Sequence, residues 1–215
     1  MSKGKLYYFY STMNSGKSST LILKEYQFRQ SGSTTFVMKP SIDTRSNETI
    51  KSRAIVNELP CYVFGKDKDL FKFVFSLIGQ TLIQSHELND ICVFVDEANF
   101  LTKEQVQQLF ELTRSRYNIK VFCYGLKNTY KNELFESSER LLVLADKVEE
   151  IKSKCSTKHC ENKATTHIRY VDGKPFLEGE SINVGDVNAD DDYYSSVCQS
   201  CFHEITNSYK HIGKK

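Results

Sequence analysis

The chain has 215 residues, of which 40% are hydrophobic and 26% charged, and 29 Lys and Arg against 27 Asp and Glu leave a formal charge of +2. This composition is typical of a globular protein and argues against a disordered or fibrous one. The small net charge, the lack of a bilayer-spanning apolar segment and the lack of a signal-peptide pattern lead us to expect a cytoplasmic protein with no nucleic-acid or membrane partner.

From residue 5 to about residue 150, short apolar runs rich in β-branched and aromatic residues alternate with segments of helical periodicity. This order is typical of an α/β fold, in which a parallel sheet carries helices on both faces. The expected strands are Leu6–Tyr10, Thr35–Met38, Cys61–Phe64, Ile91–Val95 and Lys120–Tyr124.

Three helices are predicted between these strands. The first follows the run Ser11–Ser18 and is marked by an apolar stripe of Leu21, Ile22 and Tyr26, and Gly32 is placed to end it. The second is marked by the apolar periodicity of residues 70–78. The third should begin after Thr102, because the Thr102 hydroxyl can cap it while the Gln105 side chain reaches back to complete a capping box.

The run from Ser11 to Ser18, Ser-Thr-Met-Asn-Ser-Gly-Lys-Ser, lies between the first strand and the first helix. It has the setting and spacing of a phosphate-binding loop, except that Ser11 stands where a glycine is usual, so we predict a phosphate-loop NTPase-like sheet. In such a loop Lys17 reaches the β- and γ-phosphates and Ser18 can ligate Mg²⁺. The alternative is a serine-rich turn that only caps the helix. The expected phosphate-binding residues are Ser11, Met13, Asn14, Ser15, Gly16, Lys17, Ser18 and Ser19.

Asp96 and Glu97 directly follow the predicted strand Ile91–Val95. An acidic residue at the carboxyl end of a parallel strand, beside a phosphate loop, is suited to hold the Mg²⁺ of a bound triphosphate, and we assign Asp96 to that role. Glu97 is then free to take a proton from an attacking hydroxyl as a general base. The alternative is that the two acidic residues only end a strand in solvent.

The cysteines fall into two groups. Three stand singly in apolar stretches, where we expect buried thiols, and these are Cys61, Cys92 and Cys123. Four form two pairs in the last third of the chain, and these are Cys155, Cys160, Cys198 and Cys201. In a reducing compartment such pairs predict a metal site before disulfides, and four thiolates would hold a structural Zn²⁺. His159 or His203 could each replace one thiolate.

Helical periodicity fades beyond residue 151, where the strand-like pieces His167–Val171 and Phe176–Leu177 lie between the cysteine pairs. We therefore expect an α/β domain over 1–152, a small zinc-ribbon or lasso domain over 153–205 and a basic tail over 206–215. A stretch with Gly and Tyr between the pairs could close over a small planar molecule and exclude water, which a kinase requires. The residues alone thus favour phosphoryl transfer to a small acceptor.

Five motifs occur in order along nearly the whole chain: Met13–Ser18, Asp43–Arg45, Asp96–Phe100, Gly125–Leu126 with Tyr130 and Phe135, and Tyr194–Cys201. Together they resemble the type II thymidine kinases. The resemblance implies ATP-dependent phosphorylation of the thymidine 5′-hydroxyl to give thymidine monophosphate, in nucleotide salvage for DNA synthesis. It also implies a homotetramer and feedback inhibition by thymidine triphosphate.

By motif position, the resemblance makes Glu97 the general base and Arg45 a residue that stabilises phosphate charge. It places the nucleoside pocket at Met13, Phe100, Leu126, Tyr130, Phe135 and Tyr194, with Val184 and Gly185 on the lasso. The chain departs from the family pattern at Asn99, Lys127, Leu134 and His167, where Gln, Asp, Pro and Thr are usual, and its lasso is several residues longer around Asp190–Asp192.

Two other classes of function stay open. A zinc-ribbon ATPase that acts on nucleic acid would also combine a phosphate loop, an acidic strand end and cysteine pairs. It should carry a basic stripe or a groove of interleaved basic and aromatic residues, and the sequence offers no convincing example. A non-catalytic nucleotide-binding scaffold is the second alternative, and it would not depend on Glu97 for turnover.

Overall fold

The computed structural model describes residues 4–42, 48–52, 55–85, 89–177 and 192–212. A six-stranded parallel sheet with the order β5-β2-β6-β7-β1-β8 forms its centre. The strands are β1 Leu6–Ser11, β2 Thr34–Pro40, β5 Tyr62–Phe64, β6 Ile91–Val95, β7 Lys120–Leu126 and β8 Lys147–Glu150. The parallel α/β prediction is confirmed, and each expected strand takes part in this sheet.

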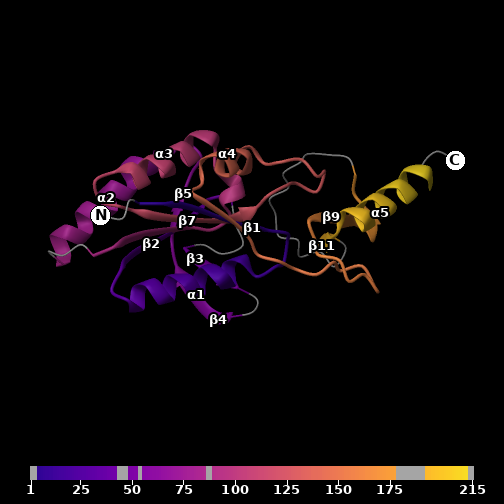
Figure 1. Ribbon diagram of the computed structural model, residues 1–215, viewed down its shortest axis with the longest axis horizontal. Helices are drawn as coiled ribbons and strands as arrows, with labels where there is room; N and C mark the ends of the chain where they lie inside the picture. The colour runs from indigo at the N-terminus through magenta and orange to yellow at the C-terminus, as the bar shows by residue number, and fades with distance from the viewer. Residues whose placement is uncertain (1–3, 43–47, 53–54, 86–88, 178–191, 213–215) are drawn as a thin grey trace.

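Helices cover both faces of the sheet, as predicted (Figure 1). Helix α1 (Lys17–Gln30) lies on one face, where Leu21 and Ile22 pack against Phe94 and Phe122 of the central strands. Three helices lie on the other face: α2 (Leu70–Ser85), α3 (Lys103–Arg114) and α4 (Glu136–Leu144). Because successive strand residues point to opposite faces, the two hydrophobic cores alternate along each central strand.

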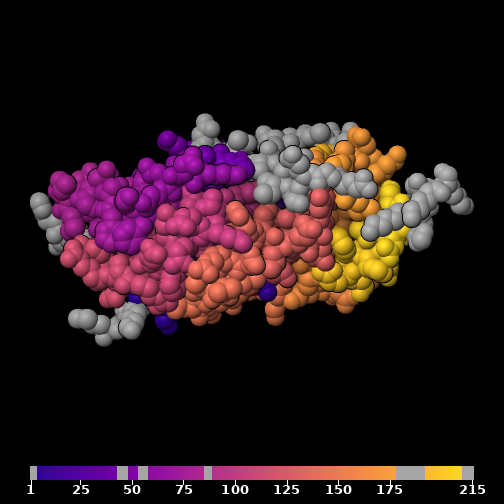
Figure 2. Space-filling model, turned by 90° about the horizontal axis from the view of Figure 1, so that it is seen from above, coloured from indigo at the N-terminus to yellow at the C-terminus, as the bar shows by residue number. Residues whose placement is uncertain are grey.

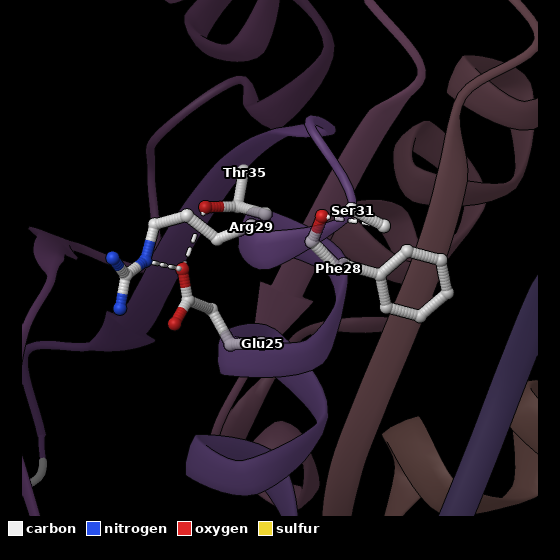
Figure 3. A network of polar contacts seen from close by, with 5 residues as sticks. All are labelled: Glu25, Phe28, Arg29, Ser31 and Thr35. Atoms are coloured by element: carbon white, nitrogen blue, oxygen red, sulfur yellow. Dashed lines mark hydrogen bonds and ion pairs between the residues drawn. The ribbon is translucent and has the colours of Figure 1, made fainter.

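A buried carboxylate ties α1 to the sheet (Figure 3). Glu25 accepts a hydrogen bond from the Arg29 Nε at 3.1 Å and another from the Thr35 Oγ1 of β2 at 2.7 Å. A buried carboxylate is costly unless it is paired, so these bonds favour one rotation of α1 on the sheet. The helix ends at Gln30, and Gly32 follows with φ 86°, in agreement with the predicted stop.

The predicted start of α3 is also confirmed. The Thr102 Oγ1 accepts a hydrogen bond from the Gln105 backbone N–H at 3.1 Å, and the Gln105 Oε1 accepts one from the Thr102 N–H at 3.2 Å. Gln105 also donates through its Nε2 to the carbonyls of Gly65, Lys66 and Lys68. The capping box therefore anchors the loop before α2 as well as the helix that it begins.

Several elements were not predicted. The hairpin β3 (Thr49–Ser52) and β4 (Ile55–Pro60) lies outside the main sheet, and β8 is an edge strand whose residues are mostly exposed. Exposed strands lack the continuous apolar runs on which sequence prediction depends. Helix α4 and the 3₁₀ turn η1 (Ala98–Phe100) complete the set in this part of the chain.

Beyond residue 150 the chain forms a smaller unit, which Figure 2 shows in orange to yellow at one end of the long axis. Its antiparallel sheet has the order β10-β9-β11, formed by Lys174–Pro175, Thr166–Val171 and Asp192–Val197. Helix α5 (Gln199–Ile212) follows; it was not predicted, and it crosses residue 205, where a basic tail was expected to begin. Residues Phe176 and Leu177 lie just after β10 instead of forming a strand.

Among the helices in the described ranges, none combines the length and the hydropathy needed to cross a membrane.

Candidate active site

The phosphate loop lies at the carboxyl end of β1, between that strand and α1. Ser11, which stands in place of the usual glycine, is the last residue of β1, and its hydroxyl donates to the Ile151 carbonyl. The Ser11 side chain thus bonds to the segment that follows β8. This position accepts a serine because the backbone there is extended strand and not a left-handed turn.

The loop that follows turns on two residues with positive φ, Asn14 at 56° and Gly16 at 82°. The Thr12 carbonyl accepts hydrogen bonds from the Ser15 hydroxyl at 2.7 Å and from the Lys17 Nζ at 2.9 Å. Lys17 is buried at the start of α1, so its charge is held at the amino end of the helix. Successive N–H groups, a helix amino terminus and a lysine are the components of an anion site.

Ser18 and Asp96 meet although 78 residues separate them. The Ser18 Oγ donates to the Asp96 Oδ2 at 2.9 Å, which joins the first turn of α1 to the end of β6. Burial raises the pKa of Asp96, and the negative charge of Glu97 raises it further, whereas the Ser18 hydrogen bond and the Lys17 charge oppose the shift. A cation at this position would remove that penalty, so the pair has the chemistry of a magnesium site.

Glu97 occupies a left-handed backbone conformation, φ 50°, at the turn from β6 into η1. Its N–H donates to the Asp96 Oδ1 at 3.0 Å, and the side chain is almost fully buried. The turn is pressed against β7, because a Cβ on Gly125 would lie 2.8 Å from the Asn99 nitrogen. The Asn99 Oδ1 also accepts the Leu126 N–H at 3.0 Å. These contacts fix the backbone that carries Glu97.

A hollow of about 190 Å³ brings the predicted phosphate and base residues together. It is lined by the loop from Met13 to Ser19 and by Glu97. Lys51 and Ser52 of β3 line it too, and they were not predicted because no motif marks the hairpin that brings them there. Glu97 therefore faces the same space as the phosphate-binding residues.

The predicted nucleoside residues fall into two groups of contacts. The Phe100 and Phe135 rings meet edge to face, with centroids 6.2 Å apart, and both line a cavity of about 280 Å³ beside Asn99 and Thr129. On the side of the smaller unit, the Tyr130 ring lies 5.9 Å from the Phe176 ring.

Tyr194 of β11 contacts His167 of β9, with ring centroids 5.5 Å apart. Arg169 acts electrostatically on Tyr130 and on Tyr194, which places these two tyrosines around one cation. Leu126 is buried at the end of β7, and Met13 lies in the phosphate loop. Arg45, Val184 and Gly185 lie outside the described residues.

The four paired cysteines converge. One ligand atom from each of Cys155, Cys160, Cys198 and Cys201 lies within 4.8 Å of the others. The Sγ atoms of Cys160 and Cys198 are 3.9 Å apart, close to the roughly 3.8 Å that tetrahedral Zn–S bonds of about 2.3 Å require. The Cys155 Sγ accepts the Cys198 N–H at 3.3 Å, and the Cys198 Sγ accepts the Cys201 N–H at 3.5 Å. These donors favour thiolate sulfur, so the residues fit Zn²⁺.

The smaller unit contacts the phosphate loop through residues to which the sequence analysis assigned no role, although Thr12 and Ser196 lie within two of its motifs. The Ser196 Oγ of β11 donates to the Met13 carbonyl at 2.7 Å. The Thr12 Oγ1 and the Ser153 Oγ are 2.9 Å apart. Ser153 lies between β8 and Cys155, and Ser196 lies on β11 just before Cys198. The two bonds therefore connect both parts of the cysteine cluster to the loop that would hold the triphosphate. Their partners are distant in the chain, so only the fold reveals them.

Comparison with known proteins agrees with this geometry. A family model described as thymidine kinase matches residues 4–202. A thymidine kinase of Lactococcus lactis is 36% identical over 91% of this chain and 95% of its own length, and one of Shewanella oneidensis is 37% identical over 94% and 97%. A thymidine kinase of Enterobacteria phage T4 is 37% identical over 94% of this chain and 96% of its own. Because the family model and these relatives align with nearly the whole chain, the chain belongs to the thymidine kinase family.

Proposed function

We propose that the chain transfers the γ-phosphate of ATP to the 5′-hydroxyl of thymidine and releases thymidine monophosphate. The observation that carries the proposal is the shared hollow, because Glu97 faces the space lined by the phosphate loop while Ser18 and Asp96 are bonded beside it. The relatives that bear the name thymidine kinase support the identity of the acceptor.

The loop would bind the triphosphate through its backbone N–H groups and Lys17. On binding, the Lys17 ammonium would exchange its contact with the Thr12 carbonyl for a phosphate oxygen, which is a stronger, charge-assisted partner. Ser18 and Asp96 would hold Mg²⁺, which neutralises phosphate charge when it is bound. Lys51 lies at the edge of the same hollow and adds a second positive charge, although Glu58 already pairs with it at 2.7 Å.

Glu97 would accept the proton of the 5′-hydroxyl as that oxygen attacks the γ-phosphorus. The carboxylate is suited to this role because its backbone is fixed by Asp96 and by the packing of η1 against Gly125. A base held in place by its own backbone needs little reorganisation when the proton moves. Glu97 therefore acts as the catalytic base in this proposal, and Asp96 acts through the cation.

The acceptor would bind between the aromatic residues at the end of β7 and the sheet of the smaller unit. Phe100, Phe135 and Tyr130 offer flat apolar surface that suits a pyrimidine ring, and burial there would exclude the water that competes for the phosphoryl group. Zn²⁺, held by the four cysteines, would be structural, because a four-thiolate site leaves no open position for a reacting water.

Product formation from a panel of nucleosides tests the proposal. Wild-type protein with ATP and Mg²⁺ should convert thymidine to its monophosphate, with deoxycytidine as the comparison acceptor and single-stranded DNA as the comparison stimulant of ADP release. ADP release that responds to DNA and not to thymidine would instead identify the zinc-ribbon ATPase that the sequence left open.

We also infer that the chain forms a homo-oligomer, a tetramer by the family resemblance. Large apolar side chains are exposed on one surface, with Leu23 57% and Tyr26 52% exposed on α1 and Tyr62 44% exposed on β5. A groove of about 880 Å³ lies among them. Exposed apolar patches of this kind favour association. Light scattering of the wild type and of Leu23→Glu should show whether the assembly depends on this surface.

Thymidine triphosphate is the inhibitor that this site favours. The molecule carries a thymidine group for the acceptor pocket and a triphosphate for the hollow of the loop, so one ligand can use both. We expect inhibition that is competitive with thymidine. Noncompetitive inhibition with respect to thymidine would argue for a different binding site.

A further inference from the structure

The loop 128–134, between β7 and α4, forms one wall of the cavity of about 280 Å³. It contributes Thr129, Glu133 and Leu134 to the lining, and Phe135 follows directly. The loop is closed by its own backbone: the Thr129 N–H donates to the Glu133 carbonyl at 2.7 Å, and residues 128 and 134 form an antiparallel bridge. These bonds set the shape of the loop, but its place against the opposite wall of the cavity depends on what holds it from outside.

The smaller unit holds the loop from outside. The Asn128 Nδ2 donates to the Thr166 Oγ1 of β9 at 2.9 Å. The side-chain amides of Asn132 and Gln199 exchange two hydrogen bonds, each 3.1 Å long. The Tyr130 ring also packs on this unit. The loop that walls the cavity is therefore attached to β9 and to the start of α5.

The bond from Asn128 is the buried one of these contacts. Asn128 is 5% exposed and Thr166 is fully buried, whereas Asn132 and Gln199 are exposed, so that water competes for their amides. A buried amide costs free energy unless it is hydrogen-bonded. The Asn128 NH₂ group has two hydrogens, and its nitrogen lies 3.1 Å from the Thr129 carbonyl in addition to the bond with Thr166. One side chain thus joins the loop to the smaller unit.

The partner of Asn128 is itself firmly placed. Thr166 pairs in register with Val197 of β11, the residue before Cys198. Val197 and Ile168, two residues beyond Thr166, pack with the cysteines in one buried cluster. The bond therefore fixes the loop to the strand pair that also carries part of the cysteine cluster.

We propose that Asn128 is a positioning residue for the acceptor: its bond to Thr166 holds the loop 128–134 on the smaller unit, and with it the wall of the cavity that meets the nucleoside. The inference rests on the proposed function and deepens it, because it takes this cavity as part of the acceptor site. Asn128 acts through the loop and does not touch the reacting atoms, and Glu97 keeps the role of the base.

Substitutions of Thr166 test the bond with little change in volume. Thr166→Val removes the acceptor atom and Thr166→Ser keeps it. A loop that spends less time in the binding conformation weakens apparent affinity by the lost fraction, and loss of one hydrogen bond corresponds to about three- to tenfold. We expect that rise in the KM for thymidine in Thr166→Val, a KM near that of the wild type in Thr166→Ser and an unchanged KM for ATP in both. Thr206→Val is the matched control, because Thr206 is buried in the same unit and its hydroxyl bonds within α5.

The partner variant decides whether the two residues act through one bond. Asn128→Ala should raise the KM for thymidine, and adding Thr166→Val to it should raise the KM no further. Effects that multiply in the double variant would overturn the proposal. So would a wild-type KM in Thr166→Val, an equal rise in Thr166→Val and Thr166→Ser, or a joint rise in the KM values for ATP and thymidine that Thr206→Val shares, since the last two would mean that only packing or stability has changed.

Hydrogen exchange, read by mass spectrometry, tests the loop without catalysis. The N–H groups of Thr129 and Asn132 are bonded within the loop, to the carbonyls of Glu133 and Thr129. A peptide that covers residues 128–134 should therefore exchange faster in Thr166→Val than in the wild type, while peptides of α3 exchange alike in both. Equal exchange of the loop in the two proteins would overturn the proposal. Failure of the wild type to phosphorylate thymidine, with the difference in exchange present, would instead overturn the proposed function.

Discussion

Replacement of Glu97 by glutamine tests the catalytic assignment with little disturbance of the fold. Glutamine has nearly the same shape, and the left-handed backbone at φ 50° imposes the same strain on either residue. The carboxylate charge raises the pKa of Asp96, so its removal lets Asp96 ionise more readily. We therefore expect Glu97→Gln to unfold at the wild-type temperature or above it and to bind ATP with Mg²⁺ at least as well as the wild type.

Turnover should change in the opposite direction. Loss of a positioned general base lowers kcat by about 10²-fold or more, equal to about 2.7 kcal/mol of transition-state stabilisation. The assay is formation of thymidine monophosphate at saturating ATP and thymidine, beside nucleotide binding measured by calorimetry. Glu104→Gln is the control, because Glu104 is exposed on α3 and lines neither the hollow of the phosphate loop nor the neighbouring cavity. An unchanged kcat in Glu97→Gln would refute the reasoning, since it would show that proton transfer does not depend on this carboxylate.

Three further predictions concern the smaller unit. Wild-type protein should contain about one zinc per chain by elemental analysis, and Cys198→Ser should lose the metal and unfold at lower temperature; a zinc-free wild type of full stability would contradict the assignment. Asp192→Asn should destabilise the fold by about 1–3 kcal/mol in denaturant titrations. The largely buried Arg169 guanidinium donates to both Asp192 carboxylate oxygens, at 3.0 and 2.6 Å, and the asparagine would leave it only one neutral acceptor. An unfolding midpoint equal to that of the wild type would show that solvent replaces the ion pair. Burial lowers the pKa of His167 from 6.5 to about 3 in the folded protein, so the unfolded chain binds the imidazole proton at a higher pH than the folded one. The free energy of unfolding should therefore decrease as pH falls below 6.5, by up to about 1.4 kcal/mol per pH unit. His167→Phe should show a shallower decrease, and equal slopes in the two proteins would mean that other groups cause it.

The central sheet could be predicted because its strands are continuous apolar runs, and because two of them are followed by recognisable motifs, the phosphate loop and the acidic pair Asp96 and Glu97. Ile91–Val95 is buried along its whole length, and its predicted bounds agree with β6. The edge strand β8 carries no such signal because its residues are mostly exposed, and in β3 Ile50 is the one fully buried residue. Helix α5 was not predicted, although Phe202, Ile205 and Tyr209 recur at helical spacing; Phe202 and Ile205 pack on the cysteine cluster.

Some residues of the candidate site could likewise be predicted from the sequence, and others could not. Lys17, Ser18, Asp96 and Glu97 follow the carboxyl ends of two parallel strands, which lie at the same edge of the sheet, so the sequence could group them although they are far apart in the chain. In the structure, Ser18 and Asp96 are hydrogen-bonded. Ser196 and Lys51 come from segments that tertiary packing brings to the loop. Their contacts with the loop could not be predicted, because they depend on the packing of segments that are distant in the sequence.

The bonds from Ser196 to Met13 and between Thr12 and Ser153 have a thermodynamic consequence. If zinc orders the strands that make these bonds, part of its binding free energy goes into shaping the loop that receives ATP. Linkage is reciprocal, so a bound triphosphate would then raise the affinity of the four cysteines for zinc by the same factor. The zinc affinity measured by competition with a chelator would therefore depend on whether the nucleotide site, at the far side of the interface, is filled.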